Sequence, residues 1–309
     1  MIPTALTRLL QDSRVRAVLS VLQKVVGLAA MFFIARELSH IGWRGLWVGL
    51  PSNPAFYAAF VMIYALGPCV DALIYSRLWG ASVSKLMPVF FRKRIYNEIV
   101  FDYSGEAYLY LWARHHIALD PGQAASTIKD VNLLSGAASN VVTMVLFGVF
   151  IASGHAAILR NVDSEFLYAT MAAVILMIAI PLLLFVFRGK LLAVGGAATI
   201  SITSAHNGRI VLVLALQVAQ WSFALPQVPP SQWFLFLTAQ MLVTRLPFLP
   251  NRDIVLMSLG VALAPLIAAP QNHVATMFVI AGALSLITHA LIFAATVVRR
   301  STQSDLQLV

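Results

Sequence analysis

The sequence predicts an all-α fold, a polytopic helical bundle that is integral to a membrane. Only 11% of its 309 residues are charged, whereas a soluble globular domain carries about 25%. The mean hydropathy is +0.84, and many apolar runs are long enough to cross a hydrocarbon core of roughly 30 Å. We therefore expect one polytopic membrane domain over 1–309, with a short cytoplasmic segment at 1–16 and a C-terminal tail at 298–309.

Eight apolar runs are the predicted membrane crossings, because each is close to the length that spans a bilayer as a helix. They occupy residues 17–38, 55–77, 131–153, 166–187, 209–226, 232–249, 254–268 and 274–297. A further stretch, 95–118, either crosses the membrane or enters and leaves on the same side.

Positive charge selects between these two arrangements, because Lys and Arg gather on the cytoplasmic side of membrane proteins. If 95–118 is re-entrant, 17 of the 21 Lys and Arg residues fall on the cytoplasmic side and 3 on the far side, and Lys24 lies within the first crossing. If 95–118 crosses, the tally becomes 9 inside against 11 outside. The sequence therefore predicts eight crossings, one re-entrant helical hairpin and both termini in the cytoplasm.

The overall charge and the first apolar run predict the location. The formal net charge is +9, which anionic headgroups at the cytoplasmic surface explain better than nucleic acid does. Arg8, Arg14 and Arg16 precede the first run, which has no convincing small-residue cleavage site and is typical of an uncleaved signal anchor. We expect an integral protein of a bacterial cytoplasmic (inner) membrane.

The stretch "NEIVFDYSGE" at 97–106 concentrates acidic residues in an apolar setting. Glu98, Asp102 and Glu106 are spaced four apart, so on a continuous helix they share one face. Ser104 and Gly105 form a candidate break at the tip of a hairpin. Irregular backbone at membrane depth is tolerated only beside protein or a water-filled cavity, so we expect the carboxylates to line such a cavity.

Other ionisable residues near or within apolar runs are candidate functional groups, because each costs about 2.5–3.5 kcal/mol to insert. These are Asp71, Arg114, Arg245 and Asp253, the last two beside helix-breaking prolines. Structural interpretations of these and nearby residues stay open. Residues 92–94 are also typical of a cytoplasmic anchor, and Glu98 could pair with Arg94. Asp71 could bond to a neighbouring helix, and His289 could be a hydrogen-bonded interhelical residue. The broken segments 95–118 and 245–260 occupy corresponding places in the two halves, which is compatible with inverted repeats.

The order of these features resembles the flippase-like membrane domain of lysylphosphatidylglycerol synthases and their stand-alone relatives. Asn97, then Gly105 and Glu106, then Arg114 match that family's re-entrant segment loosely, and "TRLPFLPNRD" (244–253) stands where its second break lies. The proline–glycine that precedes the family's first glycine–acidic pair is missing, and "PFLPNRD" offers Asp253 in place of glycine and glutamate. The resemblance implies about eight spans and movement of a lipid or lipid-linked phosphate between leaflets.

Three functions follow from these residues. The leading hypothesis is a lipid transporter without a cofactor, in which Arg114 and Arg245 hold a headgroup phosphate and Glu106, Asp102 and Asp71 balance their charge. The second is a prenyltransferase-like membrane enzyme that holds Mg²⁺ on the acidic residues, although a second aspartate cluster is missing. The third is a non-catalytic partner subunit.

Overall fold

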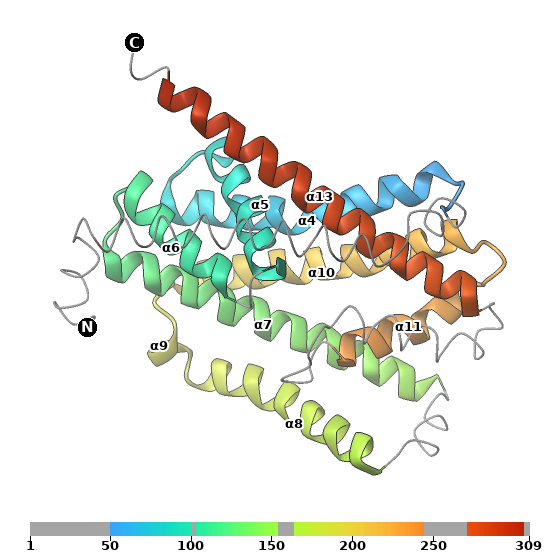
Figure 1. Cartoon of the computed structure of the whole chain (residues 1–309). Coiled ribbons are helices and arrows are strands. Elements are labelled where there is room, and N and C mark those ends of the chain that lie inside the picture. The colour runs from blue at the N-terminus through green and yellow to red at the C-terminus, as the bar shows by residue number, and fades with distance from the viewer. Residues whose placement is uncertain (1–49, 100–102, 154–163, 244–270, 306–309) are drawn as a thin grey trace. The chain divides into compact units, whose positions relative to one another are not determined.

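The computed structural model describes residues 50–99, 103–153, 164–243 and 271–305, and every regular element in these ranges is a helix. We keep the labels of Figure 1. The described helices are α4 (Pro54–Trp79), α5 (Val83–Ile99), α6 (Ser104–His116), α7 (Pro121–Ala152), α8 (Ser164–Val186), α9 (Arg188–Leu191), α10 (Gly196–Ala224), α11 (Pro230–Val243) and α13 (Gln271–Asp305). The predicted all-α class is confirmed for this part of the chain.

Four helices are long and apolar enough to cross a membrane: α4, α7, α10 and the Thr276–Thr296 part of α13. Helices α4 and α13 match the predicted crossings 55–77 and 274–297. Helix α8 coincides with the predicted crossing 166–187, and α11 covers the start of 232–249. The predicted crossings 17–38 and 254–268 lie outside the described residues, so the total of eight stays a prediction.

Two crossings begin earlier than hydropathy predicts. Helix α7 starts at Pro121 and α10 at Gly196, whereas their apolar runs start at 131 and 209. The start of α7 is set by its cap, because the Asp120 carboxylate accepts hydrogen bonds from the backbone N–H groups of Gly122 and Gln123. Pro121 fits the first helical position, where its missing N–H costs nothing. Helix ends therefore follow capping, while the apolar run marks only the part suited to lipid.

The chain forms two compact units. Among the described residues, the first contains 75–99, 103–128 and 283–305, and the second contains 50–74, 129–153, 164–243 and 271–282. Helices α4, α7 and α13 each contribute one portion to each unit. The units are described separately below.

In the second unit, a buried carboxylate fixes the connection that leads into α10. Asp130 is fully buried on α7, and its Oδ2 accepts hydrogen bonds from the backbone N–H groups of Ala193 (2.6 Å) and Val194 (2.9 Å). Its Oδ1 lies 2.9 Å from Lys129 Nζ, and Lys129 also donates to the Leu191 carbonyl. Backbone N–H groups outside a helix need a hydrogen-bond acceptor, and Asp130 supplies one, so it ties the α9–α10 connection to α7.

In the first unit, the stretch predicted as a helical hairpin over 95–118 is a pair of antiparallel helices, and its re-entrant course stays a prediction. Helix α5 begins at Val83, twelve residues before the predicted segment, and ends at Ile99; α6 runs from Ser104 to His116. We call these two helices and their turn the hairpin. Its break lies immediately before the predicted Ser104–Gly105 position. Basic residues 92–94, interpreted from sequence as an anchor outside the hairpin, belong to its first arm.

Candidate functional site

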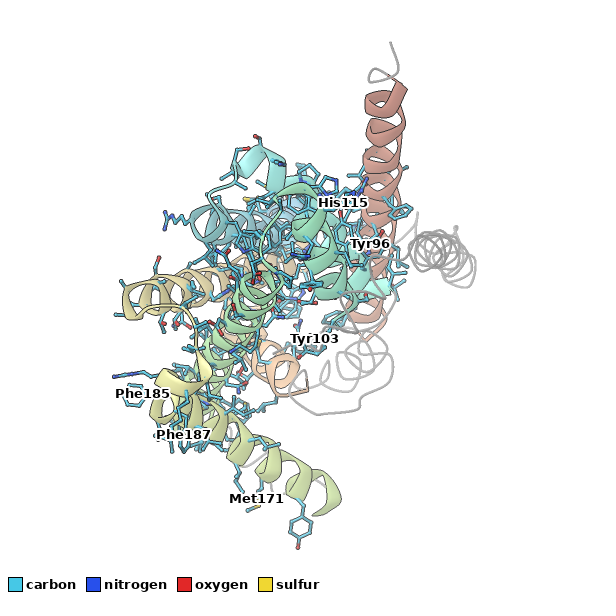
Figure 2. All side chains as sticks on the ribbon, turned by 90° about the vertical axis from the view of Figure 1, so that its left-hand side faces the viewer. Tyr96, Tyr103, His115, Met171, Phe185 and Phe187 are labelled. Atoms are coloured by element: carbon cyan, nitrogen blue, oxygen red, sulfur yellow. The ribbon has the colours of Figure 1, made fainter. Side chains whose placement is uncertain are left out.

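The hairpin is the strongest candidate site, because its two arms carry most of the paired charges that the structure describes. The contacts between the arms show that the arms are antiparallel, because residues early in α5 meet residues late in α6. Lys85 Nζ donates to the His116 carbonyl (3.1 Å) at the open end, the Tyr96 and Tyr108 rings lie 5.0 Å apart, and Lys93 contacts Glu106 nearer the turn. The labelled Tyr96, Tyr103 and His115 mark the first arm, the turn and the open end (Figure 2).

The turn is stabilised by side chains of α5 rather than by its own cap residue. Tyr103 occupies the N-cap of α6 with a left-handed backbone (φ 72°) and makes no capping hydrogen bond with its side chain. Instead, Asn97 Oδ1 accepts a hydrogen bond from the Gly105 N–H (2.6 Å), and the Ser104 hydroxyl donates to the Tyr96 carbonyl (2.7 Å). Asn97 therefore satisfies one of the first N–H groups of α6, the task that an N-cap normally performs.

Gly105 is the point of closest approach between the arms. A β-carbon at this position would collide with the Lys93 carbonyl oxygen and lie 2.8 Å from both Asn97 Oδ1 and Lys93 Cγ. Real β-carbons essentially never show contacts this short, so only glycine fits here. The Asn97, Gly105 and Glu106 pattern noted in the sequence is thus a packing arrangement in this structure.

A largely buried ion pair joins the two arms beside this contact. Lys93 Nζ lies 3.2 Å from Glu106 Oε1, and the two side chains are only 10% and 14% exposed. The other carboxylate oxygen of Glu106 is buried and makes no hydrogen bond within the described residues. Removing one member of such a pair costs about 3–5 kcal/mol, because the remaining charge stays buried without compensation.

A second charged group connects the hairpin to α13. Glu98 lies 2.6 Å from Arg94 Nε, the predicted i,i+4 pair, and 3.0 Å from His289 Nε2 on α13. Glu98 therefore links α5 to α13, with a cation on its own helix and an imidazole on the other.

Arg92, like Lys85 and Arg114, is a cation of the hairpin for which the structure gives no acidic partner among the described residues. Its guanidinium donates to the Thr296 carbonyl on α13, and its Nε is buried without a hydrogen-bond partner in the part of the chain that the structure describes. We define the hairpin cluster as Arg92, Lys93, Arg94, Glu98, Glu106 and His289. With three cationic side chains against two carboxylates and a neutral His289, this cluster has a formal charge of +1 and is suited to an anion.

The structure brings together only some of the predicted site residues. Asn97, Glu98 and Glu106 all lie in the hairpin, with Glu98 on α5 and Glu106 on α6, as the predicted break near Ser104 requires, so these two carboxylates do not share the face of one continuous helix. The helix breaks between Ile99 and Ser104, which reverses the chain. Asp102 lies outside the described residues.

The other predicted residues lie elsewhere. Arg114 is near the open end of the hairpin, where its guanidinium donates to the Leu119 carbonyl (2.7 Å) in the connection to α7. Asp71 belongs to the second unit, on α4. Arg245 and Asp253 lie outside the described residues.

Sequence reasoning missed Arg92 and Lys93 because three consecutive basic residues are typical of an interfacial anchor. The sequence nevertheless contained a signal for Lys93, in its spacing from Asn97. On an antiparallel pair of helices that meets at Gly105, a cation four residues before Asn97 faces Glu106, and this is where Lys93 lies. The contact of His289 with a neighbouring helix agrees with the interhelical role considered for it.

The donor set does not favour a metal. No three His, Cys, Asp or Glu side chains gather as ligands among the described residues, and Glu98 and Glu106 each lie against a cation that would compete with Mg²⁺. The arrangement is better suited to exchanging one anion for another at the same cations. The chain was also compared with known proteins: no family model, curated protein or solved structure matches it.

Proposed function

We propose that this protein is a lipid transporter of the cytoplasmic membrane, in which the hairpin is re-entrant and its cluster binds the phosphate of a lipid headgroup during movement between leaflets. The observation that carries the proposal is the Arg92 guanidinium, which has a backbone carbonyl but no acidic partner among the described residues, next in sequence to the largely buried Lys93–Glu106 pair. Similarity to the flippase-like domain of lysylphosphatidylglycerol synthases is part of the same proposal, through Asn97, Gly105 and Glu106.

Helix lengths support a re-entrant hairpin. Helix α5 has 17 residues and α6 has 13, which at 1.5 Å per residue gives about 26 Å and about 20 Å. Both fall short of a hydrocarbon core of roughly 30 Å. The hydrogen bond from Lys85 to the His116 carbonyl also holds the two open ends together, as expected of a segment that returns to its side of entry.

Contacts with α13 support a position at membrane depth. His289, Phe293 and Thr296 face the hairpin, through Glu98, Tyr96 and Arg92 respectively. All three lie within the apolar Thr276–Thr296 stretch of α13. His289 lies seven residues before Thr296, about 10 Å along the helix axis, so the turn of the hairpin is directed toward the interior of that stretch.

The chemistry of the cluster fits a phosphate headgroup. An arginine stays charged and presents paired N–H donors that match two phosphate oxygens, and most donors of Arg92 are unused within the described residues. Lys93 already has a carboxylate partner in Glu106. An arriving phosphate would compete with Glu106 for Lys93. In the empty site, Glu106 balances the charge of Lys93, and in the loaded site the phosphate gains a contact with Arg92.

The experiment is lipid movement in reconstituted phosphatidylcholine vesicles that contain fluorescent phosphatidylglycerol, with a membrane-impermeant quencher to report the exposed leaflet. Wild-type protein is expected to accelerate movement relative to protein-free vesicles. Arg92→Gln is expected to slow this about tenfold, which corresponds to the loss of one charge-assisted contact. Lys190→Gln is the matched control, because Lys190 is exposed on α9 and its change removes the same formal charge.

Two outcomes would contradict the proposal. Wild-type protein that leaves the rate at the protein-free level would reject the transport of this lipid class. A wild-type rate in Arg92→Gln would reject the hairpin cluster as the headgroup site and would favour the partner-subunit alternative, which predicts no effect of this charge.

A further inference from the structure

A part-buried cation, Arg209, lies in the other compact unit, and neither the hairpin nor the proposed transport site involves it. Arg209 is on α10, 13 residues after its first residue Gly196 and 15 before its last residue Ala224. Its Nη1 faces Gly67 on α4, where a β-carbon would lie 3.6 Å away. Its Nη2 donates to the Ser135 hydroxyl on α7 (3.3 Å). Three helices of one unit therefore surround this guanidinium.

The depth of Arg209 follows from the helix it packs against. Helices α4 and α10 are antiparallel, because Phe56 contacts Gln220 and Gly67 contacts Arg209. Gly67 lies near the middle of the 26-residue helix α4, about 18–20 Å from either end at 1.5 Å per residue. Since α4 is a candidate membrane span, Arg209 is brought to the middle of that span.

Most N–H donors of the Arg209 guanidinium have no hydrogen-bond acceptor among the described residues. Arginine has five N–H donors and remains charged in proteins, yet one weak hydrogen bond to Ser135 is the contact that the structure gives it. Its Nε is buried without a hydrogen-bond partner, and no carboxylate pairs with it among the described residues. A charge at membrane depth without a counter-charge is costly, so an anion bound there would be strongly stabilised.

We propose that Arg209, with the Ser135 hydroxyl, forms a second oxyanion site, which binds a phosphate group next to Gly67. Nη1 and the second N–H of Nη2 would donate to two oxygens of the anion, and Ser135 would orient the guanidinium through the other N–H of Nη2. Glycine at 67 keeps the approach open, because a larger side chain on α4 would occupy the space that faces Nη1. This site depends on no residue of the hairpin cluster.

The phosphate could come from a lipid or from solution, and the experiment separates these sources. Calorimetric titration is performed on protein in neutral detergent micelles that carries Arg92→Gln, so that the hairpin contributes no Arg–phosphate contact. The two probes are short-chain phosphatidic acid and inorganic phosphate. Arg209→Gln in this background is expected to weaken binding of the effective probe about tenfold, and Arg188→Gln, at an exposed arginine on α9, is expected to leave it unchanged.

Binding of phosphatidic acid alone assigns the site to a lipid headgroup, and equal binding of inorganic phosphate assigns it to a soluble anion. Gly67→Leu keeps the charge of Arg209 but places a large side chain next to Nη1, so it is also expected to weaken binding. This variant replaces Arg209→Gln in the test if Arg209→Gln fails to fold. Failure of both probes to bind in the Arg92→Gln background, or unchanged affinity in Arg209→Gln or in Gly67→Leu, would overturn this site. None of these results depends on whether the hairpin transports lipid.

Discussion

Two residues of the hairpin explain why its arms meet where they do. Gly105 permits the approach of α6 to the Lys93 backbone, and Asn97 supplies the hydrogen-bond acceptor that Tyr103 does not. Tyr103 adopts a left-handed conformation that costs a residue with a β-carbon about 1–2 kcal/mol. The turn is therefore maintained by contacts between the arms, and local preference opposes it.

Gly105→Ala is expected to destabilise the protein by about 1–3 kcal/mol, the usual range for overpacking a tight contact. The added methyl group would collide with the Lys93 carbonyl and with Asn97 Oδ1. Thermal unfolding in detergent measures the effect. Gly136→Ala on α7 is the matched control: nothing lies within 4 Å of its new β-carbon, so the helix should gain up to about 1 kcal/mol. Equal midpoints for the two variants would refute the close approach.

At the scale of the element, α5 is packed between α6 and α13 within the first unit. Its contacts with α6 include the Lys93–Glu106 ion pair and the Tyr96–Tyr108 ring pair. Its contacts with α13 are made by Arg92, Tyr96 and Glu98. Polar groups thus orient a hairpin whose apolar residues, such as Leu86 and Leu109, fill the core of the unit.

This packing predicts a specific cross-link between α5 and α13. The Tyr96 and Phe293 rings are 6.4 Å apart, so cysteines at these two positions, in a Cys69→Ser background, should be joined by a short bifunctional thiol reagent. Mass spectrometry of the digested protein detects the linked peptides. Cysteines at Tyr96 and Leu291 form the control, because Leu291 is 65% exposed and lies on another face of α13. Equal linking of both pairs would contradict the observed orientation of α13.

The sequence predicted the elements better than it predicted their contacts. Apolar runs located α4 and the membrane part of α13 closely, because lipid requires continuous apolar helices. They placed the starts of α7 and α10 too late, since these helices extend into polar sequence that Asp120 caps and Asp130 stabilises from another helix. Neither the local cap at Asp120 nor the long-range contact of Asp130 leaves a mark in hydropathy.

The candidate site was predicted in part, for a related reason. The acidic residues were recognised because charge is unusual in so apolar a chain, and Asn97 was recognised through the family resemblance. The partners of these residues were not, because Lys93 meets Glu106 only after the chain reverses between Ile99 and Ser104. Arg209 is among the 17 residues counted on the cytoplasmic side, and its contact with Gly67 near the middle of α4 could not be read from the sequence.

At the scale of the whole molecule, the central claim is that α5 and α6 form a re-entrant hairpin and that the chain does not cross the membrane there. Its most direct test is labelling of single cysteines by an impermeant thiol reagent, applied from either side of sealed vesicles in a Cys69→Ser background. Cysteines at Ser82 and His115, both exposed at the open end of the hairpin, should react from the same side. A cysteine at Tyr103, at the turn, should react from that side or from neither. Labelling of Ser82 and His115 from opposite sides, or of Tyr103 from the far side, would contradict the claim.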